Sequence, residues 1–170
     1  LVGLDVDLIL IGSGILEEQL QVLAKERGVN CRFTGRLEQQ TAIEILRNCD
    51  FFVLPSFYEG LPLVLVEALA CGCRLVCSDL AGVKQELAPH LGDALDRVTL
   101  PELIGPDTPV PSQLPAFVDR LTDSLDKALG KAPLADPKKT MPHALSHFSW
   151  HSSWQRVERL WNSLLKGIGD

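Results

Sequence analysis

The sequence predicts an α/β fold in which a parallel β-sheet is flanked by helices. Short apolar runs of strand length, such as residues 6–11 and 51–54, alternate with longer segments whose apolar residues recur at helical spacing. The apolar runs are nearly continuous, which is typical of strands that are buried on both faces of a parallel sheet. This order of elements is the pattern of right-handed βαβ units.

Strands are expected at residues 6–11, 31–33, 51–54 and 74–77. A first helix follows the Gly12-Ser13-Gly14 turn and ends near Gly28, and further helices are expected at 41–48, 83–87 and 116–129. Repeated prolines in the segment 90–113 exclude a regular helix there.

A helix is also expected to begin at Pro62, because proline suits the first helical position. Residues 63–66 are apolar on every side, so this helix should be buried. Phe148-Ser149-Trp150 should introduce a final helix, 148–166, whose tryptophans (Trp150, Trp154 and Trp161) are expected to pack in the core or a domain seam rather than stack on a sugar.

The length and charge of the chain limit its class. A chain of 170 residues suits a single domain, 1–170, and a net charge of −6 without a basic block argues against nucleic acid as a partner. No apolar run approaches the length of a membrane span. The chain opens with Leu1 and has no signal pattern, so we expect it to be a piece of a longer protein. We expect that protein to be cytoplasmic, and the alternative is that the full-length protein lies at the membrane surface.

Five cysteines stand at positions 31, 49, 71, 73 and 77, and none forms a C-x-x-C motif. We expect them to be small core residues of a protein in a reducing compartment. A disulfide or zinc site is the alternative.

Two carboxylates bracket a predicted ligand crevice. Glu59 lies in a turn just beyond the strand 51–54, and Glu67 lies inside the apolar helix that follows. The carboxyl ends of parallel strands are where open α/β sheets bind ligands, and a charge in a buried helix needs a partner.

The segment 54–72, LPSFYEGLPLVLVEALACG, resembles the signature of the retaining nucleotide-sugar glycosyltransferases of the GT-B fold, the glycosyl transferases group 1 family. The pieces LILIGSG, FTG and LVCSDLAGVKQE stand in the family's order, so the resemblance covers residues 8 to about 87. It implies the Rossmann-like, carboxyl-terminal half of a GT-B enzyme, without its first strand and amino-terminal domain. The final helix 148–166 would then pack toward that missing domain.

The resemblance implies a function. The family transfers a sugar, typically a hexose, from a nucleoside-diphosphate sugar to a hydroxyl acceptor, here an unknown glycan or lipid-linked molecule. It requires no metal or other cofactor, and it takes the amino-terminal domain as partner. The family's diphosphate-binding arginine and lysine precede this chain, so we expect the isolated chain to be inactive. The alternatives are a non-catalytic nucleotide-sugar-binding or regulatory module and a GT-B-type sugar-nucleotide epimerase.

The resemblance also implies roles for residues. Glu67 would accept hydrogen bonds from the ribose hydroxyls, with an ion pair to Arg74 as the alternative. Glu59 would be the catalytic carboxylate that contacts the transferred sugar and stabilises charge without attacking, with a solvated loop glutamate as the alternative. The diphosphate would meet backbone N–H groups at the helix start, which belong to Gly60, Leu61, Leu63 and Val64.

Weaker candidates precede that segment. Gly12 and Gly14 would lie near the donor, although a tight strand-to-helix turn explains them equally well. Arg36 would contact the nucleotide base, with an ordinary exposed arginine as the alternative. His143, His147 and His151 have helical spacing, but Ser149 and Ser152 should start a new helix between them, so we expect no metal there.

Overall fold

The computed structural model describes residues 6–131, 134 and 142–167. Its contacts divide the chain into two compact units, Leu1–Asn48 and Cys49–Asp170, which we call unit 1 and unit 2. A single domain over 1–170 stays a prediction.

Unit 1 is a βαβ unit followed by a helix. Strand β1 (Leu8–Leu10) pairs in parallel with β2 (Cys31–Phe33), and helix α1 (Glu17–Glu26) connects them. Gly28 follows α1 with a φ of 63°, the left-handed conformation that commonly ends a helix at glycine. Helix α2 (Gln39–Leu46) begins two residues earlier than expected. The predicted strand 6–11 is confirmed over its central residues.

Unit 2 contains a sheet of three parallel strands in the order β3 (Phe51–Leu54), β4 (Arg74–Ser78) and β5 (Leu95–Val98). Helix α3 (Leu63–Cys71) connects β3 to β4. A π-helical turn (Val83–Leu87) and the short helix α4 (Ala88–Leu91) lead on to β5. The parallel α/β architecture predicted from the sequence is therefore confirmed.

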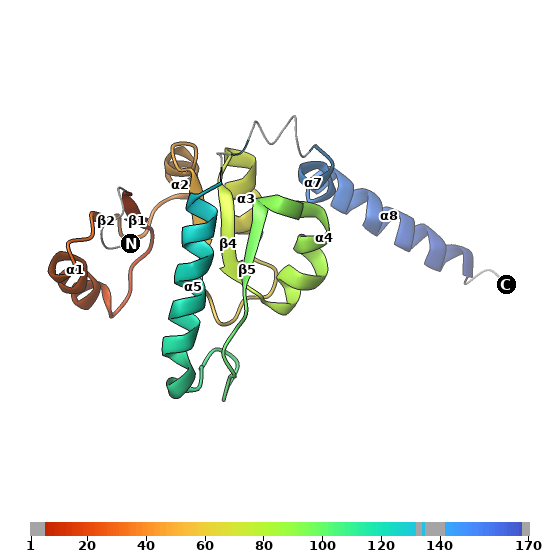
Figure 1. Cartoon of the computed structure of the whole chain (residues 1–170). Coiled ribbons are helices and arrows are strands. Elements are labelled where there is room, and N and C mark those ends of the chain that lie inside the picture. The colour runs from red at the N-terminus through yellow and green to blue at the C-terminus, as the bar shows by residue number, and fades with distance from the viewer. Residues whose placement is uncertain (1–5, 132–133, 135–141, 168–170) are drawn as a thin grey trace. The chain divides into compact units, whose positions relative to one another are not determined.

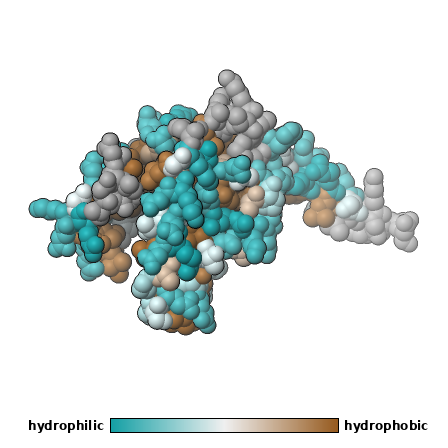
Figure 2. All heavy atoms as spheres, in the orientation of Figure 1, coloured by the Kyte–Doolittle hydropathy of each residue, from teal (hydrophilic) through white to brown (hydrophobic). Residues whose placement is uncertain are grey.

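Helix α5 (Leu114–Leu129) packs against β4 and β5 (Figure 1). The core between them is made of Val76, Val98, Phe117 and Ala128, all less than 5% exposed. Because successive strand side chains point to opposite faces, the neighbours of Val76 point away from α5. The side of α5 that faces the viewer in Figure 2 is mainly hydrophilic, as expected of a helix with one buried stripe.

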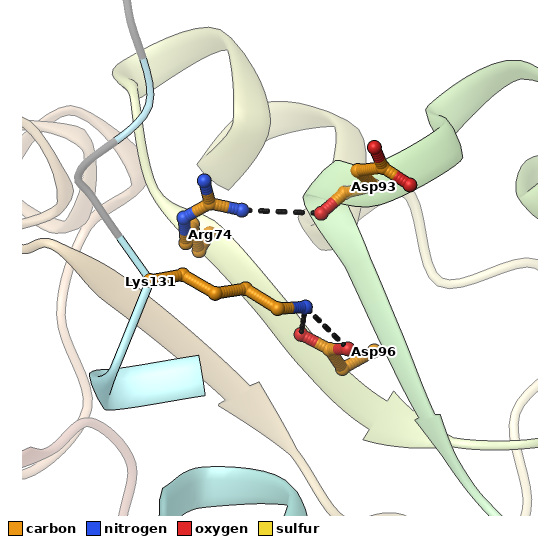
Figure 3. A network of polar contacts seen from close by, with 4 residues as sticks. All are labelled: Arg74, Asp93, Asp96 and Lys131. Atoms are coloured by element: carbon orange, nitrogen blue, oxygen red, sulfur yellow. Dashed lines mark hydrogen bonds and ion pairs between the residues drawn. The ribbon is translucent and has the colours of Figure 1, made fainter. Parts of the chain in front are cut away.

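Polar contacts join the strands at their amino-terminal ends (Figure 3). Lys131, just after α5, donates from Nζ to both carboxylate oxygens of Asp96 at 2.8 Å. Arg74 donates from Nη1 to the backbone carbonyl of Asp93 at 3.1 Å. These contacts fix the start of β5 against β4 and α5, on the edge of the sheet opposite the carboxyl ends.

The structure corrects three expectations. Strand β5 was not predicted within the proline-rich segment 90–113. Helix α3 is not buried on every side, because Leu63 in its first turn is 53% exposed while Leu65, Ala68 and Leu69 are buried. Pro62 is the residue before the first helical residue rather than the first residue itself.

Two helices follow the segment in which few residues are described. Helix α7 (Pro142–His147) was not predicted, and α8 (Trp150–Gly167) matches the expected final helix. The tryptophans of α8 are not in the core of this chain, because Trp150, Trp154 and Trp161 are 91%, 68% and 63% exposed. Among the described residues, no helix combines the length and apolar character needed to cross a bilayer.

All five cysteines are free thiols. Cys73 and Cys77 are fully buried, whereas Cys31, Cys49 and Cys71 are partly exposed. Burial raises the pKa of the Cys73 and Cys77 thiols to about 12. The prediction of small core residues therefore holds fully for two of the five.

Candidate functional site

The loop 55–62 leaves the carboxyl end of β3 and leads into α3. Its Phe57 ring packs against Phe117 of α5, with ring centroids 5.2 Å apart and an interplanar angle of 55°. A tilted aromatic pair of this kind adds to the burial of both rings. The loop is therefore anchored to the core of unit 2 on one side.

Glu59 lies at the exposed tip of this loop. Ser56 Oγ donates a hydrogen bond to Glu59 Oε1 at 3.0 Å. This bond restricts the carboxylate while leaving its other oxygen available to an incoming hydroxyl donor. The sequence prediction of a carboxylate beyond the strand end is confirmed.

Gly60 touches the next loop of the sheet. An added Cβ at Gly82 would lie 2.2 Å from the carbonyl oxygen of Gly60, a distance that real Cβ atoms do not reach. Gly82 follows β4, so the loops after β3 and β4 meet backbone to backbone at the carboxyl edge of the sheet. Glycine at 82 is required by this close approach, because its own φ of −64° is open to any residue.

Helix α3 begins directly after this contact. Its first amide groups point toward the loop, as in every helix, and no described side chain caps them. Leu65 N–H bonds to the Pro62 carbonyl at 3.0 Å, so the predicted donors before it, Leu61, Leu63 and Val64, remain the candidates for an oxygen ligand. Leu61 and Leu63 are 43% and 53% exposed, so this rim is open to solvent.

Glu67 lies on α3, four residues beyond Leu63, which is about one helical turn. It is partly buried and already interacts with another group of the chain. A ribose would therefore bind Glu67 beside that group or displace it. Arg74, the alternative partner considered for Glu67, begins β4 and donates to the Asp93 carbonyl.

The carboxyl end of β4 contributes two further polar residues. Asp79 forms an ion pair with Arg97 of β5 at 2.5 Å, which offsets the negative charge beside the loops. Ser78 is fully buried, and its hydroxyl has no hydrogen-bond partner among the described residues.

The earlier candidates belong to unit 1. Gly12, with a φ of 129°, donates its N–H to the Gly35 carbonyl at 2.9 Å, so the turn after β1 is tied to the turn after β2. Gly14 lines an open hollow with Glu17 and Glu18, whose charges disfavour a phosphate. Arg36 is exposed.

Comparisons with known proteins identify the family. Residues 3–94 match the family described as "Glycosyl transferases group 1". The chain belongs to this family. The GDP-mannose-dependent monoacylated alpha-(1-6)-phosphatidylinositol monomannoside mannosyltransferase of Corynebacterium glutamicum is 29% identical over 167 residues, which are 94% of this chain and 39% of that protein.

Two further proteins are similar to this chain. The N-acetylgalactosamine-N,N'-diacetylbacillosaminyl-diphospho-undecaprenol 4-alpha-N-acetylgalactosaminyltransferase of Campylobacter jejuni is 32% identical over 83 residues, which are 49% of this chain and 23% of that protein. The structure of sucrose-phosphate synthase from Thermosynechococcus elongatus matches with a TM-score of 0.63 at 19% identity, over 95% of this chain and 39% of that one. The fold is that of GT-B glycosyltransferases, and the chain spans about two fifths of the first relative's length.

Sequence reasoning missed the residues that hold the loop 55–62 in place. Ser56 and Phe57 act through contacts with Glu59 and Phe117, and Gly82 acts through its approach to Gly60. A short polar residue three positions before Glu59 is a signal that could have indicated the serine contact. The contacts of Phe57 and Gly82 join segments that are distant in the sequence, so no local sequence pattern predicts them.

The row of histidines is divided as expected. Helix α7 ends at His147 and α8 begins at Trp150, with Ser149 Oγ accepting a hydrogen bond from Ser152 N–H at 3.1 Å. In the described part of the chain, no group of three or more His, Cys, Asp or Glu side chains is placed to hold a metal ion.

Proposed function

We propose that this chain is the donor-binding domain of a retaining glycosyltransferase, which moves a sugar from a nucleoside-diphosphate sugar to a hydroxyl acceptor. The observation that supports this most is the loop 55–62, held by Phe57 on one side and by the Gly60–Gly82 approach on the other. It presents Glu59 beside the uncapped start of α3. A fixed carboxylate next to free backbone donors suits a sugar joined to a diphosphate.

Each residue has a role in this proposal. Glu59 contacts the hydroxyls of the transferred sugar, and the amides of Gly60, Leu61, Leu63 and Val64 contact the diphosphate. No metal or other cofactor is needed for these contacts.

The remaining donor contacts lie farther along the nucleotide. Glu67 accepts hydrogen bonds from the two ribose hydroxyls. Gly12, Gly14 and Arg36 of unit 1 are kept as candidates for contacts with the nucleotide.

The relatives guide the choice of substrates. The Corynebacterium relative is named as GDP-mannose-dependent and as acting on a phosphatidylinositol mannoside, and the Campylobacter relative is named for an undecaprenol-linked acceptor. We propose a nucleotide hexose as donor and a lipid-linked or glycan hydroxyl as acceptor for the protein that contains this chain. A cytoplasmic location, at or near the membrane surface, suits such an acceptor.

Helix α8 has an exposed apolar stripe of Trp150, Trp154, Val157 and Trp161. We propose that this stripe packs against the acceptor-holding domain of the whole protein, which this chain does not include. Transfer needs both halves to close around the two substrates, so the chain alone should bind the donor without transferring the sugar.

Calorimetric titration of the chain with UDP-, GDP- and ADP-sugars tests the donor site. Glu67→Ala should weaken binding of the preferred nucleotide by about 1–3 kcal/mol through lost charge-assisted hydrogen bonds, and Glu67→Gln by less. Asp123→Ala, which removes an exposed carboxylate from α5, is the matched control and should bind as wild type. Unchanged affinity in a folded Glu67→Ala variant contradicts the ribose role.

Product analysis of the whole protein separates the three activities. A glycosyltransferase forms the sugar–acceptor product, whereas an epimerase releases free nucleotide without transfer. A non-catalytic module binds the donor and leaves it unchanged. Turnover by the isolated chain would contradict the need for the second domain.

A further inference from the structure

A cationic cleft lies in unit 2 between α4, α7 and α8, away from the candidate donor site. Its volume is about 460 Å³. Histidine, arginine, hydroxyl and amide side chains line it, and the described lining contains no carboxylate. Its lining includes His90, His147, Ser152, Gln155, Arg156 and Arg159.

The position of the cleft separates it from the donor site. His90 lies on α4, five residues before β5 begins, so it is close to the amino-terminal edge of the sheet. Figure 1 shows α7 beside α4 at that end of unit 2, whereas the loop with Glu59 follows the carboxyl end of β3. A ligand in the cleft would therefore not occupy the donor site.

The centre of the cleft is a stacked pair of imidazoles. The rings of His90 and His147 have centroids 3.9 Å apart and planes inclined by 24°, and the ring of Phe148 meets both edge-on. Arg156 Nη1 lies 3.1 Å from His147 Nε2 and donates to the His147 carbonyl at 3.2 Å. Three groups that carry or can carry positive charge are thus held in contact by three helices, α4, α7 and α8.

Repulsion among these groups disfavours protonation of His147 unless an anion is present. Burial, His90 and Arg156 lower the pKa of His147, and Glu86 on the π-helical turn opposes them. The other ionisable groups in the described lining of the cleft are His143 and Arg159. A dianion in the cleft would reverse the repulsion and give the imidazoles an acceptor.

We propose that this cleft binds the phosphate group of a soluble phosphate monoester or inorganic phosphate. Arg156 and Arg159 supply guanidinium N–H groups suited to two phosphate oxygens, and the Ser152 hydroxyl and Gln155 amide supply neutral donors. His147 binds as an imidazolium ion, and His90 donates a ring N–H. This set of donors neutralises a dianion and leaves room for a small organic group in the cleft.

The geometry of α8 favours a soluble ligand over a lipid headgroup. Arg159 follows Trp150 by nine residues, which at 3.6 residues per turn places them on opposite sides of the helix. The exposed apolar stripe that could enter a membrane therefore faces away from the cleft. A headgroup bound to Arg159 would hold the tryptophans off the bilayer.

Calorimetry with inorganic phosphate and glycerol phosphate, together with imidazole NMR signals, tests the site. We expect millimolar or tighter binding, a rise in the pKa of His147 with ligand, and at least a tenfold loss of affinity in Arg156→Gln and Arg159→Gln. Lys127→Gln, which removes an exposed cation from α5, is the matched control and should bind as wild type. His90→Asn gives a second test if an arginine variant fails to fold.

Three results would overturn the proposal. One is the absence of any phosphate-dependent change at the two imidazoles. Another is wild-type affinity in folded Arg156→Gln and Arg159→Gln variants. The third is binding to phosphatidylglycerol vesicles that depends on Arg159, without binding of soluble phosphate. Nucleotide-sugar affinity should be the same in Arg159→Gln and wild type, so failure here is distinguishable from failure of the donor-site proposal.

Discussion

Replacing Gly82 by alanine tests whether the contact between two loops sets the geometry of the candidate donor site. The added Cβ would lie 2.2 Å from the Gly60 carbonyl oxygen, 3.3 Å from its carbonyl carbon and 3.7 Å from the Leu61 Cα. Because heavy atoms pack best at about 3.5–4.0 Å, the loops must separate by roughly 1 Å or more. All three neighbours are backbone atoms, so no flexible side chain can absorb the shift.

The expected loss has two opposing parts. Gly82 has φ −64° and ψ −36°, so alanine fits the backbone and stabilises the fold by about 0.4–1 kcal/mol through the unfolded state. Overpacking destabilises by about 1–3 kcal/mol, which leaves a net loss of about 1–2 kcal/mol. Glu59 moves with Gly60, and a misplacement of about 1 Å can reduce activity by up to about 100-fold.

Urea unfolding and donor titration measure the two consequences. Gly130→Ala is the matched control, because its Cβ would meet the nearest atom at 3.5 Å and its φ is −73°. We expect Gly82→Ala to lose stability and at least roughly tenfold in donor affinity, whereas the control keeps its donor affinity and loses no stability. The reasoning is refuted if the two variants are equal in both measurements.

Three further predictions concern buried or titrating groups. Because the pKa values of Cys73 and Cys77 are about 12, these two thiols should not react with Ellman's reagent at pH 8 until guanidinium unfolds the chain. Rapid reaction of all five thiols in the folded chain would contradict this. Ser78→Ala should raise the free energy of unfolding by about 1 kcal/mol, because it removes a buried hydroxyl without a described partner; a clear loss would reveal a partner. The pKa of His147 is lowered in the folded state from its ordinary 6.5, so the unfolded chain binds more protons and stability should fall as pH drops below about 6.5. Urea titrations of His147→Gln should show a weaker fall, and an equal fall would assign the effect to other groups.

The sequence predicts an element well where its own composition decides the structure. Strand β3 is confirmed at Phe51–Leu54, because an apolar run bounded by Pro55 needs no distant partner to be recognised. The left-handed Gly28 likewise ends its helix as expected. The carboxylate Glu59 is found beyond the strand because the loop position follows from the strand's end.

Elements that depend on distant partners could not be predicted. Strand β5 has two charged residues among four, a pattern that argues against a buried strand. In the fold, Asp96 pairs with Lys131 and Arg97 pairs with Asp79, residues 35 and 18 positions away. The exposure of Leu63 also depends on what covers the first turn of α3, and the sequence does not contain that information locally.

The paired charges of β5 also bear on self-association. β5 lies at one edge of the described three-stranded sheet, where unpaired backbone groups invite strand addition by a second molecule. Asp96 and Arg97 point to opposite faces, so an added chain would meet a charged side chain above and below that edge. Natural proteins use such charges to prevent sheets from joining into aggregates, and we infer that these two residues protect the folded chain in the same way.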